Sequence, residues 1–242
     1  MRSPSSFTAT GITAFAAFAG VTVVHLVAQL VDPDSLVTDA TQWLLMPLLA
    51  LGLAASTEPR RDRLVKLTLL ALVFSWLGDA APDLFDGDAA FLVLIGFFLC
   101  AQITYIAAFL PYRDRSVLHT KRWVLALYAV AVVVLVAVCA PGAGALAAAV
   151  VIYGLCIATM AVLATGVSRA VAWGAVVFVI SDSLIALNAF VDGFSLPATG
   201  FWIMITYICA QALITGGVLS RSGTARDSGD RAGSADRTAD AG

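Results

Sequence analysis

The feature that most constrains the fold of this chain is a series of apolar runs, each about 20 residues long. A helix needs about 20 residues to cross the ~30 Å hydrocarbon core of a bilayer. Of the 242 residues, 60% are hydrophobic and 12% are charged, whereas a soluble domain has about 25% charged residues. The runs are also longer and more continuous than the strands of a membrane barrel. The sequence therefore predicts an all-α polytopic membrane protein.

The apolar runs divide into eight predicted spans, whose boundaries are accurate to a few residues. They cover residues 7–31, 38–56, 64–81, 91–110, 123–140, 143–165, 170–190 and 199–219. We expect them to form one bundle of eight transmembrane helices, residues 1–219. Residues 220–242 contain no apolar side chain larger than alanine. Such a segment cannot bury a core, so we expect a disordered tail.

Basic residues fall on one side of the eight-span arrangement, in the segments around 58–66, 113–122 and 169 and at the two ends of the chain. In the segments on the other side, every charged residue is acidic. The positive-inside rule then places both termini, and with them the tail, in the cytoplasm. We expect a multi-pass protein of the cytoplasmic membrane. The net charge of −2 gives no indication of a nucleic-acid partner.

Two aspartates, Asp79 and Asp182, lie inside apolar runs. A charge in hydrocarbon costs several kcal/mol unless it is protonated, paired or hydrated, so intramembrane acids are candidates for function. Asp79 follows Lys66 by thirteen residues, and Asp182 follows Arg169 by thirteen. At ~1.5 Å per residue, both carboxyl groups lie about 20 Å from the cytoplasmic edge. The sequence thus predicts two acids at equal depth.

Further polar side chains in the spans fall near the same depth. The glutamines also fit a structural role as interhelical hydrogen-bond partners, and the tyrosines fit a role in packing. Equal depth across several helices favours one polar site. Its predicted members, besides the aspartates, are Ser75, Gln102, Tyr105, Ser181, Tyr207 and Gln211.

No metal or cofactor is predicted. The four cysteines all lie in predicted spans and lack the spacing of metal ligands, so we interpret them as packing residues. The two histidines are too few to hold a metal without the aspartates.

The polar residues form short motifs in a definite order. These are Phe74-Ser75-x-x-Gly78-Asp79, Gln102-x-x-Tyr105, Ser181-Asp182-Ser183 and Tyr207-x-x-x-Gln211. In these motifs the chain resembles the YhhN-type lysoplasmalogenases, which are bacterial and animal membrane enzymes of about eight helices. Two positions depart from the family pattern. Gln102 stands where the family often has a histidine, and Met46 stands where it often has a lysine.

The resemblance implies hydrolysis of the vinyl ether bond of a lysoplasmalogen, which gives a fatty aldehyde and a glycerophospho-alcohol. A vinyl ether is hydrolysed by protonation of its β-carbon, followed by addition of water to the resulting cation. One carboxyl group that stays protonated and one carboxylate that activates water would suffice, without a metal. We assign these two roles to Asp79 and Asp182, and binding of a lysophospholipid substrate from the membrane to the six other polar residues.

If the two carboxyl groups act on one substrate, they should face each other across one cavity. We expect them to lie within about 8 Å, a separation that leaves room for a water molecule.

Two other functional classes use paired intramembrane acids. A proton-coupled transporter or lipid exporter would use Asp79 and Asp182 as a proton relay. An intramembrane aspartyl protease would require a Gly-x-Gly-Asp pattern, which fails because Trp76 occupies the first glycine position. The sequence does not indicate a protein partner or a preferred lipid head group.

Overall fold

The computed structural model describes residues 8–57 and 61–239, and within these residues the regular structure is entirely helical. The long helices are α1 (Ala9–Val31), α2 (Leu36–Ser56), α3 (Arg63–Ala80), α4 (Gly87–Phe109), α6 (Arg122–Ala143), α7 (Ala147–Ala164), α8 (Arg169–Phe190) and α9 (Thr199–Ala239). The short elements are η1 (Ala81–Leu84), η2 (Leu110–Arg115), α5 (Val117–Thr120) and η3 (Gly144–Leu146). The predicted all-α class is confirmed.

Polar residues set several of these helix boundaries. The hydroxyl groups of Ser35 and Ser168 cap α2 and α8 by accepting hydrogen bonds from backbone N–H groups. The carboxylate of Asp62 accepts the N–H of Val65 at 2.9 Å and caps α3. Such caps satisfy donors that a helix leaves free at its first turn. Because each cap lies next to an apolar run, the helix starts coincide closely with the predicted starts of the spans.

Seven helical stretches are long and apolar enough to cross a membrane within the described part of the chain. One of them, Trp123–Ala164, is 42 residues long and contains both α6 and α7. The backbone stays helical through η3 and turns at Gly144, whose φ is +50°. The chain is therefore a multi-pass membrane protein by composition, but the count of eight spans is not confirmed and stays a prediction.

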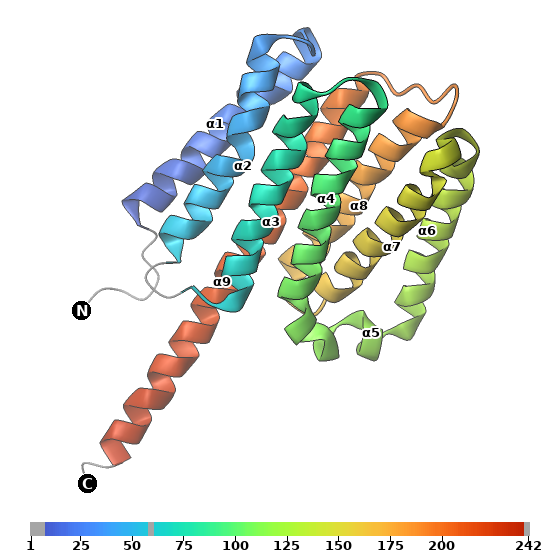
Figure 1. Ribbon diagram of the computed structural model, residues 1–242. Coiled ribbons are helices and arrows are strands. Elements are labelled where there is room, and N and C mark those ends of the chain that lie inside the picture. Colours follow the sequence, from blue (N-terminus) through green and yellow to red (C-terminus); the bar gives the residue numbers. More distant parts are fainter. Residues whose placement is uncertain (1–7, 58–60, 240–242) are drawn as a thin grey trace.

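The last helix continues well past the predicted end of its span at residue 219. Helix α9 runs to Ala239 and extends beyond the bundle (red in Figure 1). Residues 240–242 lie outside the described residues. The disorder expected for residues 220–242 stays a prediction.

The helices form one bundle in which α9 occupies a central place (Figure 1). Helix α9 packs against α1, α2, α3 and α8, while α4 packs against α3 and α7. Helices α1 and α2 form one flank, and α6 forms the other (Figure 1). The polar residues of α3, α4, α8 and α9 therefore project from neighbouring helices, as the prediction of a shared site requires.

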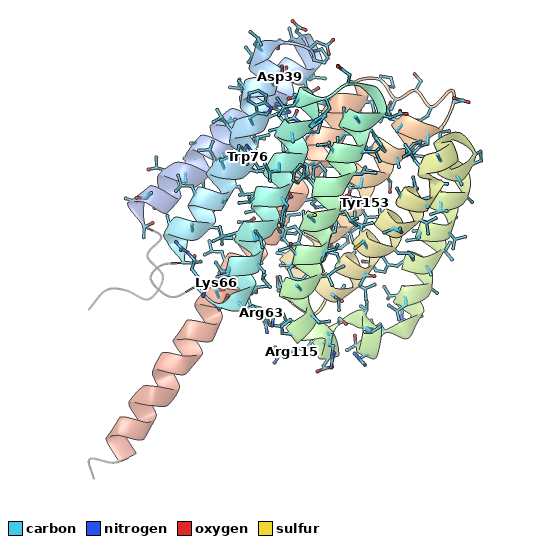
Figure 2. All side chains as sticks on the ribbon, in the orientation of Figure 1. Asp39, Arg63, Lys66, Trp76, Arg115 and Tyr153 are labelled. Atoms are coloured by element: carbon cyan, nitrogen blue, oxygen red, sulfur yellow. The ribbon has the colours of Figure 1, made fainter. Side chains whose placement is uncertain are left out.

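The ends of the bundle differ in charge. Figure 2 shows Arg63, Lys66 and Arg115 at one end and Asp39 at the opposite end. This arrangement agrees with the one-sided pattern of basic residues in the sequence. The difference in charge allows a simple test of how the bundle is oriented across the membrane.

We predict that the end with Arg63, Lys66 and Arg115 faces the cytoplasm, because basic loops are retained on that side. A reporter fused after Ser220 should report the cytoplasm. The same reporter inserted in the segment Asp83–Asp88 should report the exterior. Reports from the same side at both positions would contradict the arrangement.

Glycines allow α8 and α9 to approach closely. A Cβ atom added at Gly174 would lie 2.9 Å from the backbone oxygen of Ala210 and from the backbone nitrogen of Ile214. One added at Gly217 would lie 2.9 Å from the backbone nitrogen of Val171. Small residues at such contacts let membrane helices pack backbone to backbone.

We predict that Gly174→Ala destabilises the bundle by about 1–3 kcal/mol, the usual cost of overpacking. The matched control is Gly216→Ala, because a Cβ at Gly216 meets no atom within 4 Å. Thermal unfolding in detergent should give a lower midpoint for Gly174→Ala and an unchanged or higher midpoint for the control. Equal midpoints for the two variants would show that the close approach is not required.

Candidate functional site

The first polar cluster links α3, α4 and α9 through three hydrogen bonds. The Tyr207 hydroxyl donates to Oδ2 of Asp79 at 2.8 Å. The Gln211 amide donates to Oγ of Ser75 at 2.9 Å and accepts the Tyr105 hydroxyl at 2.6 Å. All five side chains are buried, and Asp79 is 7% exposed. We call this set the Asp79 cluster.

The positions of these residues in their helices explain why they meet. Ser75 and Asp79 are four residues apart on α3, and Tyr207 and Gln211 are four residues apart on α9. Residues at this spacing lie on one face of a helix. The two helices pack together, so their polar faces meet in two layers. Tyr105 then reaches Gln211 from α4.

The second carboxylate, Asp182, lies on the wall of an apolar cavity between α4, α6, α7 and α8. The cavity is lined mainly by aliphatic and aromatic side chains, with Tyr128 and Tyr153 among its polar members. The Tyr153 hydroxyl, on α7, donates a short hydrogen bond to Oδ2 of Asp182. Asp182 is 9% exposed. We call this space the Asp182 cavity.

Asp79 is not among the residues that line the Asp182 cavity. The cavity therefore differs from the single space that we expected the two aspartates to share. Sequence spacing gave their depth along the helices, but depth says nothing about rotation around a helix axis. Asp79 points toward α9, where Tyr207 binds it, and Asp182 points toward α7, where Tyr153 binds it.

Phe98 connects the two polar regions. Its ring lines the Asp182 cavity and lies edge-on to the ring of Tyr207, with 5.6 Å between centroids. Phe178 completes the group, with its centroid 5.7 Å from that of Tyr207 and 6.4 Å from that of Phe98. A Cβ added at Gly78 would lie 2.9 Å from the Phe98 ring. Gly78, next to Asp79, therefore leaves the space that the Phe98 ring occupies.

Two predicted site residues do not join either hydrogen-bonded group. Gln102 is fully buried, and neither its amide nitrogen nor its amide oxygen has a hydrogen-bond partner. Its side chain lies next to the Tyr153 hydroxyl. Ser181 donates its hydroxyl to the backbone oxygen of Ile203 at 3.0 Å, a contact that joins α8 to α9.

Sequence reasoning missed Tyr153. Its depth could have identified it, because it precedes Thr165, at the end of α7 next to Arg169, by twelve residues. At ~1.5 Å per residue it lies about 18 Å from that end, close to the depth inferred for Asp182. The residue stands in a run of small and aliphatic side chains, where a tyrosine is easily taken for a packing residue.

Comparison with known proteins supports the resemblance seen in the motifs. Residues 37–218 match the model of the YhhN family, so the match includes every residue of the Asp79 cluster and the Asp182 cavity. No curated protein and no solved structure matches the chain.

The two glutamines provide a test of the Asp79 cluster. Gln211→Leu removes a donor and an acceptor and leaves Ser75 and Tyr105 unpaired, which we expect to cost about 1–3 kcal/mol. Gln102→Leu removes none of these three hydrogen bonds, so its unfolding midpoint in detergent should fall less. A midpoint for Gln211→Leu at or above that of Gln102→Leu would contradict the network.

Proposed function

The chain belongs to the YhhN family, and we propose that it is a membrane-embedded hydrolase that cleaves the vinyl ether bond of a lysoplasmalogen or a related lysolipid. The observation that carries this proposal is a buried carboxylate, Asp182, on the wall of an apolar cavity. An apolar cavity within the bundle suits a single alkenyl chain, and a carboxyl group on its wall suits acid–base chemistry at the end of that chain.

The proposed reaction needs one proton donor and one proton acceptor. A proton passes from a carboxyl group to the β-carbon of the vinyl ether, and the electron pair of the double bond forms the new C–H bond. The resulting oxocarbenium ion adds water at the adjacent carbon while a carboxylate accepts a proton from that water. The hemiacetal then divides into an aldehyde and the alcohol of the glycerophospho group. Atoms and charge balance without a metal or cofactor.

Asp79 and Asp182 share the two proton-transfer roles in this proposal. The Phe98 ring lines the Asp182 cavity and packs against Tyr207, the partner of Asp79, so a movement of this ring would bring both carboxyl groups within reach of one substrate. The Asp79 cluster offers the hydroxyl and amide groups that a glycerophospho group requires, from Ser75, Tyr105, Tyr207 and Gln211. Gln102 is the remaining buried amide with unused hydrogen-bonding capacity.

A proton-coupled transporter or lipid exporter is the second candidate. The hydrogen bonds of the Asp79 cluster favour it, because linked hydroxyl and carboxyl groups inside a membrane can carry protons. The two candidates differ in product. A hydrolase releases a free aldehyde from a lysoplasmalogen, and a transporter releases none.

The direct assay incubates the purified protein with a lysoplasmalogen and with its saturated ether analogue. We expect aldehyde from the first and none from the second, because a saturated ether has no double bond to protonate. Absence of aldehyde from lysoplasmalogens and related vinyl ether lysolipids, with a protein that remains folded, would overturn the proposed hydrolase function.

We predict that Asp79→Asn and Asp182→Asn each reduce turnover by at least ~100-fold, since an amide fills neither acid–base role and each such role contributes about 10²–10⁴-fold. The double variant should lose much less activity than the product of the two single losses, because the two groups act as a unit. The matched control is Asp192→Asn in the exposed segment after α8, which should keep full activity. Full aldehyde release by Asp182→Asn would contradict the assignment.

A further inference from the structure

Tyr153 is the donor that holds the Asp182 carboxylate across a helix interface. Asp182 belongs to α8 and Tyr153 to α7, and both side chains line the Asp182 cavity. The hydroxyl of Tyr153 donates to Oδ2 of Asp182. Among the hydrogen bonds of the described residues, this is the one that reaches the Asp182 side chain.

The two serines next to Asp182 on α8 do not donate a hydrogen bond to its carboxylate. The hydroxyl of Ser183 donates to the backbone oxygen of Val179 at 2.7 Å, and that of Ser181 donates to the backbone oxygen of Ile203. Their only hydroxyl protons are thus engaged elsewhere. The orientation of the Asp182 carboxylate therefore depends on a residue from α7.

Gln102 lies on the other side of the Tyr153 hydroxyl. The Gln102 amide lies next to that hydroxyl, although neither of its polar atoms makes a hydrogen bond of acceptable geometry. A tyrosine oxygen that donates its proton to a carboxylate can still accept from an amide N–H. The Gln102 amide is fully buried, so it offers the Tyr153 oxygen a donor in place of water. The three side chains lie in a row, with Gln102 on α4, Tyr153 on α7 and Asp182 on α8.

We propose that Tyr153 is a positioning residue for Asp182. It engages Oδ2 and leaves Oδ1 as the oxygen that can face a ligand in the cavity. The hydrogen bond also occupies Oδ2, so removal of the donor frees this oxygen to react. The importance of this role for turnover rests on the proposed hydrolase function, whereas the contact between the two side chains does not.

The first test requires no enzyme activity. Dicyclohexylcarbodiimide is an apolar reagent that modifies protonated carboxyl groups, and mass spectrometry locates the modified residue. In Tyr153→Phe, which keeps the ring and removes the hydroxyl, the rate of modification of Asp182 should rise several-fold. Tyr128 lines the same cavity without a hydrogen bond to Asp182, so Tyr128→Phe should leave that rate unchanged. An unchanged rate in Tyr153→Phe, or an equal rise in both variants, would overturn the proposal.

The second test measures turnover. For aldehyde release, Tyr153→Phe should lower kcat at least tenfold and change KM less than threefold, because the apolar walls that hold the chain stay in place. Tyr112→Phe is the control, since Tyr112 lies in η2 outside both polar regions. Unchanged kcat in Tyr153→Phe would overturn the positioning role. If the wild-type protein releases no aldehyde, the hydrolase function fails, and the modification rates still decide whether Tyr153 controls Asp182.

Discussion

A carboxyl group buried in an apolar bundle costs free energy unless a hydrogen-bond donor reaches it, and this requirement determines which helices pack beside Asp79 and Asp182. Asp79 and Asp182 are both nearly inaccessible, and the lysine or arginine nearest to each in the sequence is thirteen residues away. Each receives a hydrogen bond from a tyrosine on another helix, Tyr207 or Tyr153. A tyrosine suits this position because its ring packs in an apolar interior while its hydroxyl donates. Each pair therefore ties two helices together as it accommodates the acid.

The packing of α4, α8 and α9 places aromatic rings beside these contacts. The glycine-mediated approach of α8 to α9 brings the Phe178 ring of α8 against Tyr207, the partner of Asp79. Phe98 then occupies the space between the Asp79 cluster and the Asp182 cavity. The bundle therefore holds its two acids in separate environments, one polar and one mainly apolar. Such a difference allows two identical side chains to take different roles in one reaction.

The sequence predicted the features that depend on position along a helix. Apolar run length located the helices, and counting from Lys66 and Arg169 predicted equal depth for the two aspartates, which stays a prediction. It did not predict rotation about each helix axis, which separates Asp79 from the Asp182 cavity. It also missed Tyr153, because nothing in a short aliphatic run indicates that one tyrosine faces an acid on the following helix. The disorder expected for residues 220–242 rests on composition alone and stays a prediction.

We propose that the Asp182 cavity binds the chain of a lysolipid. A saturated ether lysolipid with a photoreactive group near the ether bond tests it most directly, because the analogue binds without being consumed. Mass spectrometry should locate the crosslinks on α7 and α8 at cavity residues such as Tyr153 and Ile185, and excess unlabelled analogue should remove them. Crosslinks confined to lipid-facing positions such as Val23 or Trp173, unaffected by excess analogue, would contradict the account.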